Sequence, residues 1–341
     1  MHNRPKISYL VTFYNAKDYV KPCLDSILSQ DDSPSYEVLL GDDGSTDGTK
    51  ELLMEYVAQY PDVMRLYSMQ RDPEDKSLGR TRMIRNRMNL LRHAQGQYIS
   101  IPDGDDYISY SKFAKESVDF LDANPQYMAY GYEIQYDING KITPVPSGIP
   151  EGELSPLVYL PSKYVSAASF VFRNVTTPDE IAELEAKNAF SDNGITLFFM
   201  NKGPLWHVNT PAYTYRQMEN STWTSTSELG KQADNASWLP TMQFCIPKHK
   251  YLVVSRCNHA LRGLWRNRRT AGSSISGNVL KRIQYQASVS NFHFVVDILN
   301  WPGLSFGRKV MLHFEYLRYR VIAKTAKILA KLMLCFQRHK K

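Results

Sequence analysis

Residues 36–49 read YEVLLGDDGSTDGT, an apolar run that ends in two adjacent carboxylates, Asp42 and Asp43. A second apolar run, in YISIPDGDDYI at residues 98–108, ends in a similar acidic cluster. That cluster consists of Asp103, Asp105 and Asp106. Carboxylates this close repel one another, which raises the free energy of ionising each of them. Mg²⁺ and Mn²⁺ relieve such repulsion and bind through one or two carboxylates together with substrate phosphates. The pattern therefore indicates a metal-assisted nucleotide site.

The N-terminal part of the chain alternates between two kinds of apolar pattern. Continuous aliphatic and aromatic runs predict strands at 7–14, 36–41, 63–69 and 97–101. Apolar residues at helical spacing predict helices around 20–28, 52–57 and 83–93. This alternation predicts an α/β fold with a mostly parallel sheet and helices on both faces. Because ligands bind at the carboxyl ends of the strands in such sheets, we expect Thr12 and both acidic clusters to share one edge.

Beyond residue 126 the predicted secondary structure changes twice. Additional strands and loops are predicted for residues 126–175, with an exposed Pro- and Gly-rich loop at 142–156. A short helix is predicted for residues 178–187. From about residue 240 the chain is predicted to be helical and rich in Arg, Lys and aromatic residues. We therefore expect an α/β nucleotide-binding domain at 1–235 and a helical, basic C-terminal region at 236–341.

The net charge of +7 comes from the C-terminal end. Residues 308–341 hold ten Lys or Arg and one acid, Glu315, so the rest of the chain is slightly acidic. Four distant cysteines without a CxxC pair indicate reduced thiols rather than a disulfide framework or a zinc site. Neither a signal peptide nor an apolar run of about 18 residues is recognisable. These features predict a cytoplasmic protein, either free or peripheral on the inner face of the plasma membrane.

The basic segment 308–336 also carries apolar residues at helical spacing. They are Val310, Phe314, Leu317, Val321, Ile328 and Leu332. A basic amphipathic helix of this kind can lie in a membrane interface and attract anionic lipids, which is the favoured interpretation. The alternatives are a helix packed on the domain with a solvated charged face, and a helix that binds a partner. Nucleic acid is not expected as a partner, because no binding motif accompanies the charge.

The chain resembles the family 2 glycosyltransferases, inverting enzymes with the GT-A fold that use nucleoside-diphosphate sugars. Four stretches between about residues 6 and 220 carry the resemblance. They are VTFYNAKDYVKPCLDSILSQ, YEVLLGDDGSTDGT, the Arg85 and Asn86 pair ahead of AQGQYISIPDGDDYI, and SDNGITLFF followed by YTYRQ. The resemblance implies transfer of one sugar, with a UDP-sugar as the expected donor, to a glycan or lipid-linked glycan in cell-surface polysaccharide synthesis. A QxxRW motif does not follow, so single addition is expected rather than processive synthesis.

The resemblance also implies roles for individual residues at the nucleotide. Thr12 and Tyr14 would contact the base, Asp43 would hydrogen-bond it, and Asp42 would support the site. Arg82, or Arg80 beside it, would meet the base or the phosphates, although a solvated surface position fits both equally well.

Within the second acidic cluster, Asp103, Gly104 and Asp105 resemble the family's DxD element, and we call these three residues with Asp106 the DxD segment. Asp105 is the expected ligand of Mg²⁺ or Mn²⁺, and Asp103 the next, either directly or through the ribose or sugar. Asp106 would shape the turn.

Residues beyond the DxD element would serve the acceptor. Asp192 is the expected general base, although an aspartate ahead of a helix is also a good N-cap. Arg216 would contact the diphosphate or the acceptor. Trp223 would line the acceptor site, or else be a buried structural tryptophan.

Two other functions stay open. A sugar-phosphate nucleotidyltransferase would need a Gly-rich loop after the first strand, which VTFYNAKDY lacks. A non-catalytic nucleotide- or glycan-binding module, tethered by the basic tail, is the other alternative.

Overall fold

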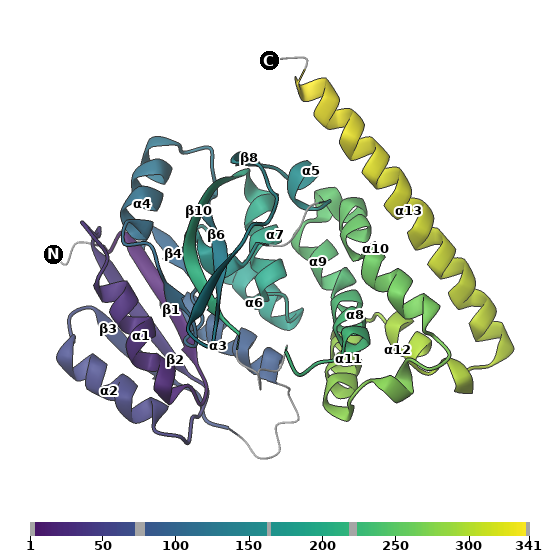
Figure 1. Ribbon diagram of the computed structural model, residues 1–341, viewed down its shortest axis with the longest axis horizontal. Helices are drawn as coiled ribbons and strands as arrows, with labels where there is room; N and C mark the ends of the chain where they lie inside the picture. Colours follow the sequence, from purple (N-terminus) through teal and green to yellow (C-terminus); the bar gives the residue numbers. More distant parts are fainter. Residues whose placement is uncertain (1–3, 72–78, 162–164, 218–223, 339–341) are drawn as a thin grey trace. The chain divides into compact units, whose positions relative to one another are not determined.

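The computed structural model describes residues 4–71, 79–161, 165–217 and 224–338 of the 341-residue chain. They form two compact units (Figure 1). The first unit comprises Met1–Leu154, Tyr164–Ala186 and Phe190–Gln217, and the second comprises Ser155–Lys163, Lys187–Ala189 and Met218–Lys341. The expected boundary after residue 235 lies inside helix α8 (Glu228–Ser237), which belongs to the second unit throughout.

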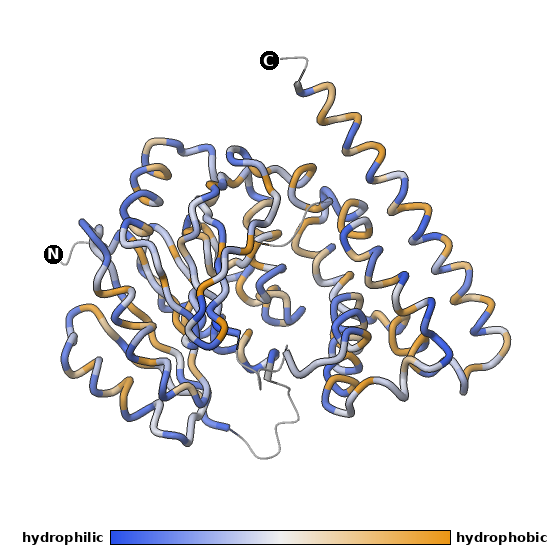
Figure 2. The backbone as a smooth tube through the Cα atoms, viewed as in Figure 1, coloured by the Kyte–Doolittle hydropathy of each residue, from blue (hydrophilic) through white to orange (hydrophobic). Residues whose placement is uncertain are grey.

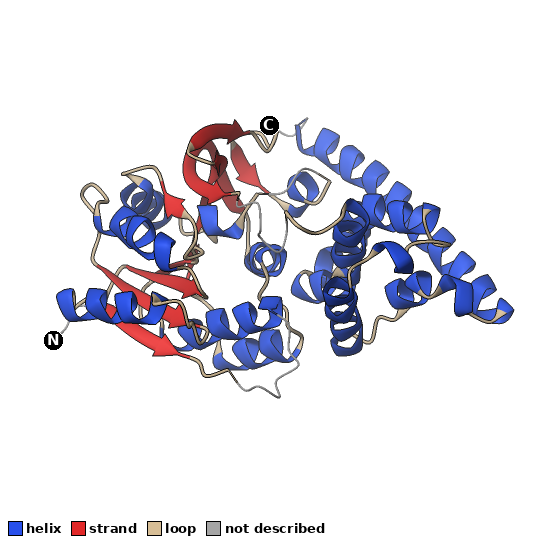
Figure 3. Ribbon diagram, turned by 60° about the horizontal axis from the view of Figure 1, so that its bottom comes forward, coloured by secondary structure: helices blue, strands red, loops and turns tan. Residues whose placement is uncertain are grey.

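A ten-stranded sheet forms the centre of the first unit (Figure 3). Its strands are β1 (Ile7–Phe13), β2 (Tyr36–Asp42), β3 (Met64–Ser68), β4 (Tyr98–Ser100), β5 (Tyr107–Ile108), β6 (Ala129–Ile138), β7 (Lys141–Val145), β8 (Gly152–Leu154), β9 (Phe170–Arg173) and β10 (Leu205–Arg216). The spatial order is β3-β2-β1-β4-β9-β6-β10-β5, while β7 pairs with β6 and β8 with β10. The four predicted strands are thus confirmed as β1 to β4.

The strand directions divide the sheet. Strands β3, β2, β1 and β4 are parallel, as predicted. Beyond β4 the sheet is mixed, because β9 is antiparallel to both β4 and β6, and β5 is antiparallel to β10. One antiparallel pair has a local cause: Asn139 and Gly140 both have positive φ and join β6 to β7 in a two-residue hairpin.

Helices cover both faces of this sheet, as the alternating pattern predicts. They are α1 (Lys17–Leu28), α2 (Thr49–Gln59), α3 (Gly79–His93), α4 (Phe113–Ala123), α6 (Pro178–Ala186) and α7 (Asp192–Lys202). On one face, Tyr9, Val11 and Phe13 of β1 share a hydrophobic core with apolar residues of α1, α2 and α4. Helix α3 contacts β1 and β2, and α6 packs beside it. Every residue of β1 is buried, as befits a central strand covered on both sides.

The Pro- and Gly-rich stretch at 142–156 is not the free excursion that its composition predicts. Many of its side chains are exposed, but β7 and β8 tie it to the sheet. The backbone N–H and the hydroxyl of Ser147 both donate to the buried Glu133 carboxylate, the hydroxyl at 2.6 Å. Sequence composition alone could not show this anchor, because it depends on a partner outside the stretch.

The second unit is helical, which confirms the prediction for the chain beyond residue 240. Its helices are α5 (Pro156–Tyr159), α8, α9 (Leu239–Cys245), α10 (Lys250–Arg266), α11 (Gly277–Val289), α12 (Phe294–Leu299) and α13 (Phe306–Arg338). Helix α13 packs on α10, where the Tyr316 ring stacks on Trp265 with centroids 4.4 Å apart. In the described part of the chain, we find no helix long and apolar enough to cross a membrane.

Candidate functional site

The predicted edge of the sheet brings the first strand and both acidic clusters together. Thr12 forms an isolated bridge with Asp103, and its carbonyl accepts a 3.0 Å hydrogen bond from the Gly104 N–H. In the parallel register of β1 and β2, Phe13 lies opposite Asp42. The expectation that Thr12, Asp42 and Asp103 share one edge is therefore confirmed.

Asp42 shapes the loop that follows β2. Its carboxylate is fully buried and accepts hydrogen bonds from the backbone N–H groups of Gly44 and Ser45, both at 3.2 Å. Gly44 has a φ of 72°, a conformation that glycine adopts without strain. The Asp42 side chain is thus occupied by its own turn, and it can support a ligand only through that turn.

Asp43 is held by two arginines. Arg82, at the start of α3, approaches one carboxylate oxygen at 2.6 Å, and Arg71 donates to the other at 2.8 Å. Arg71 also places its guanidinium 3.4 Å from the centroid of the Tyr14 ring, a cation–π contact. Tyr14 itself is 46% exposed. The segments after β1, after β2 and at the start of α3 are therefore joined in one charged cluster.

The buried side chain of Arg87 links the DxD segment to α7. One terminal nitrogen donates to Oδ1 of Asp103 at 2.6 Å, and the other donates to Oδ1 of Asp192 at 2.7 Å. Burial lowers the pKa of the Arg87 guanidinium, but the charges of Asp103 and Asp192 outweigh it and raise the pKa above its usual value. A single cation therefore holds two carboxylates that lie far apart in the sequence.

The carboxylates of the DxD segment ionise less readily than free aspartates. Burial raises the pKa of Asp103, an effect that Arg87 opposes and Asp192 reinforces. Burial and the charge of Asp103 raise the pKa of Asp105 to about 6. Burial, with the charges of Asp105 and Asp103, holds the pKa of Asp106 well above its usual range. The cluster thus carries the mutual repulsion that its sequence predicts.

Asp106 and Asp105 are also tied to the end of β10. The Asp106 carboxylate accepts hydrogen bonds from the Tyr213 hydroxyl at 3.0 Å and from the Arg216 backbone N–H at 2.8 Å. The Arg216 guanidinium donates to the backbone carbonyl of Asp105 at 2.7 Å. It also lies 4.6 Å from the centroid of the Tyr107 ring. Arg216 thus lies beside the DxD turn, and Asp106 ties that turn to β10; a contact of Arg216 with the diphosphate or the acceptor stays a prediction.

The DxD segment can supply only part of the ligand shell of a divalent cation. Among the residues that the structure describes, no group of three His, Cys, Asp or Glu side chains is arranged to hold a metal. The Asp105 carboxylate accepts a hydrogen bond from its own backbone N–H, whereas one oxygen of Asp103 accepts a hydrogen bond from Arg87. The protein can therefore offer oxygens from two carboxylates, and diphosphate and water would complete the shell of Mg²⁺ or Mn²⁺.

Asp192 is the first residue of α7, and Ser191 precedes it as the N-cap. The alternative that Asp192 itself is the N-cap is therefore wrong by one position. Its side chain is about 39% exposed, so it meets solvent as well as Arg87. A helix N-terminus favours the ionised form of such a carboxylate. Trp223 lies outside the described residues.

Two arginines of the site were not predicted, Arg71 and Arg87. Arg87 had a detectable signal, because it lies three residues after Ile84 and four before Leu91, on the buried face of α3. A charged residue on such a face requires a buried counter-ion. Of the Arg85 and Asn86 pair in the sequence, Asn86 has a structural contact instead: its side-chain amide donates to the Gly41 carbonyl of β2 at 2.9 Å.

Comparison with known proteins assigns the N-terminal half of the chain to a family. The model of the family described as Glycosyl transferase family 2 matches residues 8–173. The chain carries a domain of glycosyl transferase family 2. The family 2 domain includes Thr12 and the DxD segment, whereas Asp192 and Arg216 lie beyond the matched residues.

Two relatives illustrate the extent of sequence similarity. EpsE of Bacillus subtilis is 32% identical over 131 residues, which cover 38% of this chain and 44% of EpsE. The poly(ribitol-phosphate) beta-glucosyltransferase of Bacillus spizizenii is 31% identical over 119 residues, 33% of this chain and 18% of that protein. The chain thus spans less than half the length of these curated relatives.

The family 2 domain has the GT-A fold. A crystal structure of residues 1–349 of S. aureus TarS in complex with UDP superposes with a TM-score of 0.58 at 16% identity. The superposition covers 88% of this chain and 93% of the TarS chain. At that identity the likeness establishes the fold.

Gly104 tests how tightly the DxD turn packs on β1. An added Cβ would lie 2.3 Å from Cδ1 of Phe13, so Gly104→Ala is expected to lower the free energy of unfolding by about 1–3 kcal/mol. Gly307→Ala is the control, because nothing lies within 4 Å of its added Cβ and alanine favours helix. Urea denaturation measures both. Equal stability of the two variants would contradict the close packing.

Arg87 tests the buried ion-pair bridge. Arg87→Ala leaves two carboxylates without their shared cation and is expected to cost about 3–5 kcal/mol of unfolding free energy. Arg92→Ala on the same helix removes an exposed pair with Glu185, and its expected cost is below about 1 kcal/mol. Thermal or urea unfolding compares them. A cost for Arg87→Ala no larger than for Arg92→Ala would show that the bridge does not stabilise the fold.

Proposed function

We propose that the protein is an inverting glycosyltransferase that moves one sugar from a UDP-sugar to a glycan or lipid-linked glycan acceptor. The observation that carries this proposal is the Arg87 bridge. It joins Asp103 of the DxD segment to Asp192 at the start of α7. An inverting transferase needs its leaving-group site and its general base on opposite sides of the reacting carbon. The bridge would keep Asp103, on the leaving-group side, and Asp192, the proposed base, at a fixed separation. Cell-surface polysaccharide synthesis on the cytoplasmic side of the plasma membrane is the proposed setting.

The nucleotide would bind at the ends of β1 and β2. Tyr14 offers a partly exposed ring for base stacking, with Arg71 already against one side of it. Thr12 lies beside it, Asp42 holds the loop, and Asp43 would contact the base with Arg82 supporting it. The TarS structures, which have UDP or UDP-GlcNAc bound, share this fold and support a UDP-linked donor here.

The diphosphate would lie over the DxD turn. Asp105 and the second oxygen of Asp103 would hold Mg²⁺ or Mn²⁺, which supplies positive charge that stabilises the departing diphosphate. Arg216 lies beside Asp105 and would add a second positive charge toward the diphosphate or the acceptor. Asp105 is the first choice of ligand, because its carboxylate is not already engaged by Arg87.

Asp192 would act as general base. The acceptor hydroxyl oxygen attacks the anomeric carbon from the face opposite the diphosphate, and the bond between that carbon and the diphosphate oxygen breaks with its electron pair. The hydroxyl proton passes to the Asp192 carboxylate. Arg87 would be a positioning residue, because it holds Asp192 without touching the substrate. Trp223 remains the proposed residue for stacking on the acceptor sugar.

The DxD proposal predicts metal-dependent nucleotide binding. We expect UDP with Mn²⁺ to raise the melting temperature of the wild type, and Asp105→Asn to abolish that shift. The metal-free variant should be no less stable than the wild type, since burial and Asp103 already oppose ionisation of Asp105. Asp119→Asn, at an exposed carboxylate on α4, should keep the full shift. A full UDP and Mn²⁺ shift in Asp105→Asn would remove Asp105 from the metal site.

The base proposal predicts a loss of turnover without loss of donor binding. Asp192→Asn should lower kcat by about 100- to 10,000-fold, because general base catalysis contributes on this scale. UDP release from a panel of UDP-sugars measures turnover, and NMR of the product shows whether the anomeric configuration inverts. Asp179→Asn, in the first turn of α6, is the matched control. Tight metal-dependent UDP binding by the wild type, with no turnover across the panel, would instead favour a non-catalytic binding module.

A further inference from the structure

Helix α13 is where exposed apolar side chains gather in the described part of the second unit. The residues predicted from helical spacing are Val310, Phe314, Leu317, Val321, Ile328 and Leu332, and we call them the outer stripe. All six are exposed, and Phe314 reaches 68% and Val321 64%. Large apolar side chains that are contiguous on a surface mark an interaction site.

A different face of α13 packs on the rest of the second unit. The buried residues of this face are Leu312, Tyr316, Ala323, Ala326 and Ala330. Four of them follow an outer-stripe residue by two positions, as Leu312 follows Val310. Two residues turn an α-helix by about 200°. The outer stripe therefore lies opposite the packed face, and α13 has two apolar faces with different surroundings.

Basic side chains border the outer stripe along one side. Arg320, Lys327 and Lys331 each precede an outer-stripe residue by one position, about 100° around the helix. With Lys324 they form an exposed row. After Glu315 the sequence contains eight Lys or Arg and no acid. Figure 2 shows the resulting alternation of hydrophilic and hydrophobic residues along α13.

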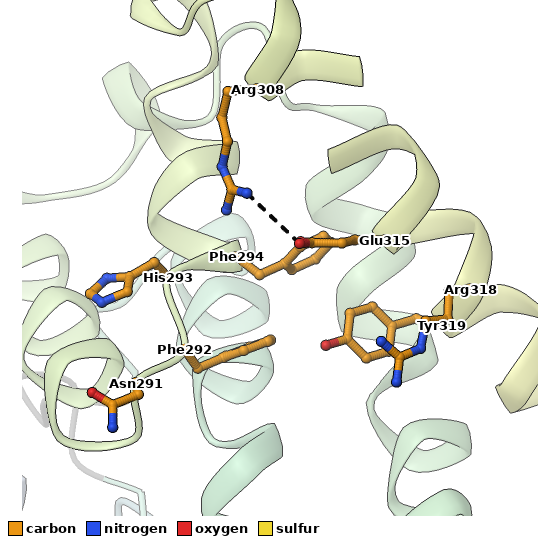
Figure 4. A pocket seen from close by; sticks show the side chains of 8 residues that line it. All are labelled: Asn291, Phe292, His293, Phe294, Arg308, Glu315, Arg318 and Tyr319. Carbon is orange, nitrogen blue, oxygen red and sulfur yellow. Dashed lines mark ion pairs between the residues drawn. The ribbon is translucent and has the colours of Figure 1, made fainter. Parts of the chain in front are cut away.

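Two acidic groups near the start of α13 pair with Arg308 within the unit. Arg308 pairs with Asp297 of α12 and approaches Glu315 at 3.8 Å, as Figure 4 shows for the second pair. Near this pair, the Tyr319 ring lies edge-on to the rings of both Phe292 and Phe294, with centroids 6.4 and 5.3 Å apart. The start of the helix is thus anchored, and the charge that faces outward farther along is positive.

We propose that α13 docks on the surface of an anionic lipid bilayer through the outer stripe. The apolar side chains would enter the boundary between headgroups and acyl chains, and the basic row would meet anionic headgroups. Lysine and arginine suit this border, because their long stems stay with apolar groups while the charge reaches the polar layer. A second copy of the chain fits less well, because two basic rows would face each other without acids.

The test is co-sedimentation of the full chain with vesicles, measured without any sugar donor. We expect binding to phosphatidylcholine vesicles that contain phosphatidylglycerol, weak binding to phosphatidylcholine alone, and release at high salt. Replacing Lys324, Lys327 and Lys331 with Gln should weaken binding by on the order of 100-fold, since each basic residue contributes about fivefold. Because donor is absent, this result is independent of the proposed glycosyl transfer.

The apolar contribution needs its own variant and control. The triple variant Phe314→Gln, Val321→Gln and Ile328→Gln should weaken binding by about tenfold or more. The control is Met54→Gln, Ile138→Gln and Ile142→Gln, three exposed apolar residues outside α13, which should leave binding unchanged. All variants should keep the wild-type melting temperature, because only exposed side chains change. Wild-type protein that stays in the supernatant with anionic vesicles would overturn the proposal. So would a dimer in sedimentation analysis that the α13 variants dissociate while vesicle binding is absent.

Discussion

The buried guanidinium of Arg87 is the constraint on which the candidate site depends. A charge removed from water is tolerated only where counter-charges and hydrogen bonds compensate it. Arg87 finds them in Asp103 and Asp192, which follow β4 and begin α7. Helix α3, the DxD turn and α7 must therefore keep one mutual arrangement for the arginine to remain satisfied. The same requirement that stabilises the fold thus holds the proposed metal site and the proposed base in register.

Charge balance distinguishes the acidic residues that the sequence presents as equivalent. Asp43 is compensated by Arg71 and Arg82, and Asp42 by backbone N–H groups. Burial, followed by the charge of Asp103, raises the pKa of Asp105 to about 6, although its own backbone N–H and the charges of Arg216 and Arg87 oppose the rise. Structural roles and the proposed metal-binding role are therefore separated by what each carboxylate touches. This separation supports Asp105 as the residue that would gain most from a bound cation.

In helix α13 the periodicity correctly predicts an apolar stripe but does not determine whether that stripe is packed or exposed. The spacing of Val310, Phe314 and Val321 indicates an amphipathic helix, and the natural alternative to membrane binding was that this stripe packs on the domain. The helix does pack on the second unit, but through Leu312, Tyr316 and three small alanines. Alanines are easily overlooked in a pattern of large apolar residues, although they allow close approach of another helix. The predicted stripe is consequently the exposed one.

The sequence by itself determined the order of the first four strands and of the three helices between them, the parallel first half of the sheet and the position of the acidic clusters at one edge. These features follow from local periodicity and from the rule that parallel strands end on the same side. Only the tertiary structure decided that the sheet becomes mixed beyond β4, that Arg87 joins Asp103 to Asp192, and which face of α13 is free. The physical reason is that periodicity defines the faces of an element, whereas what each face meets depends on contacts between residues far apart in the chain.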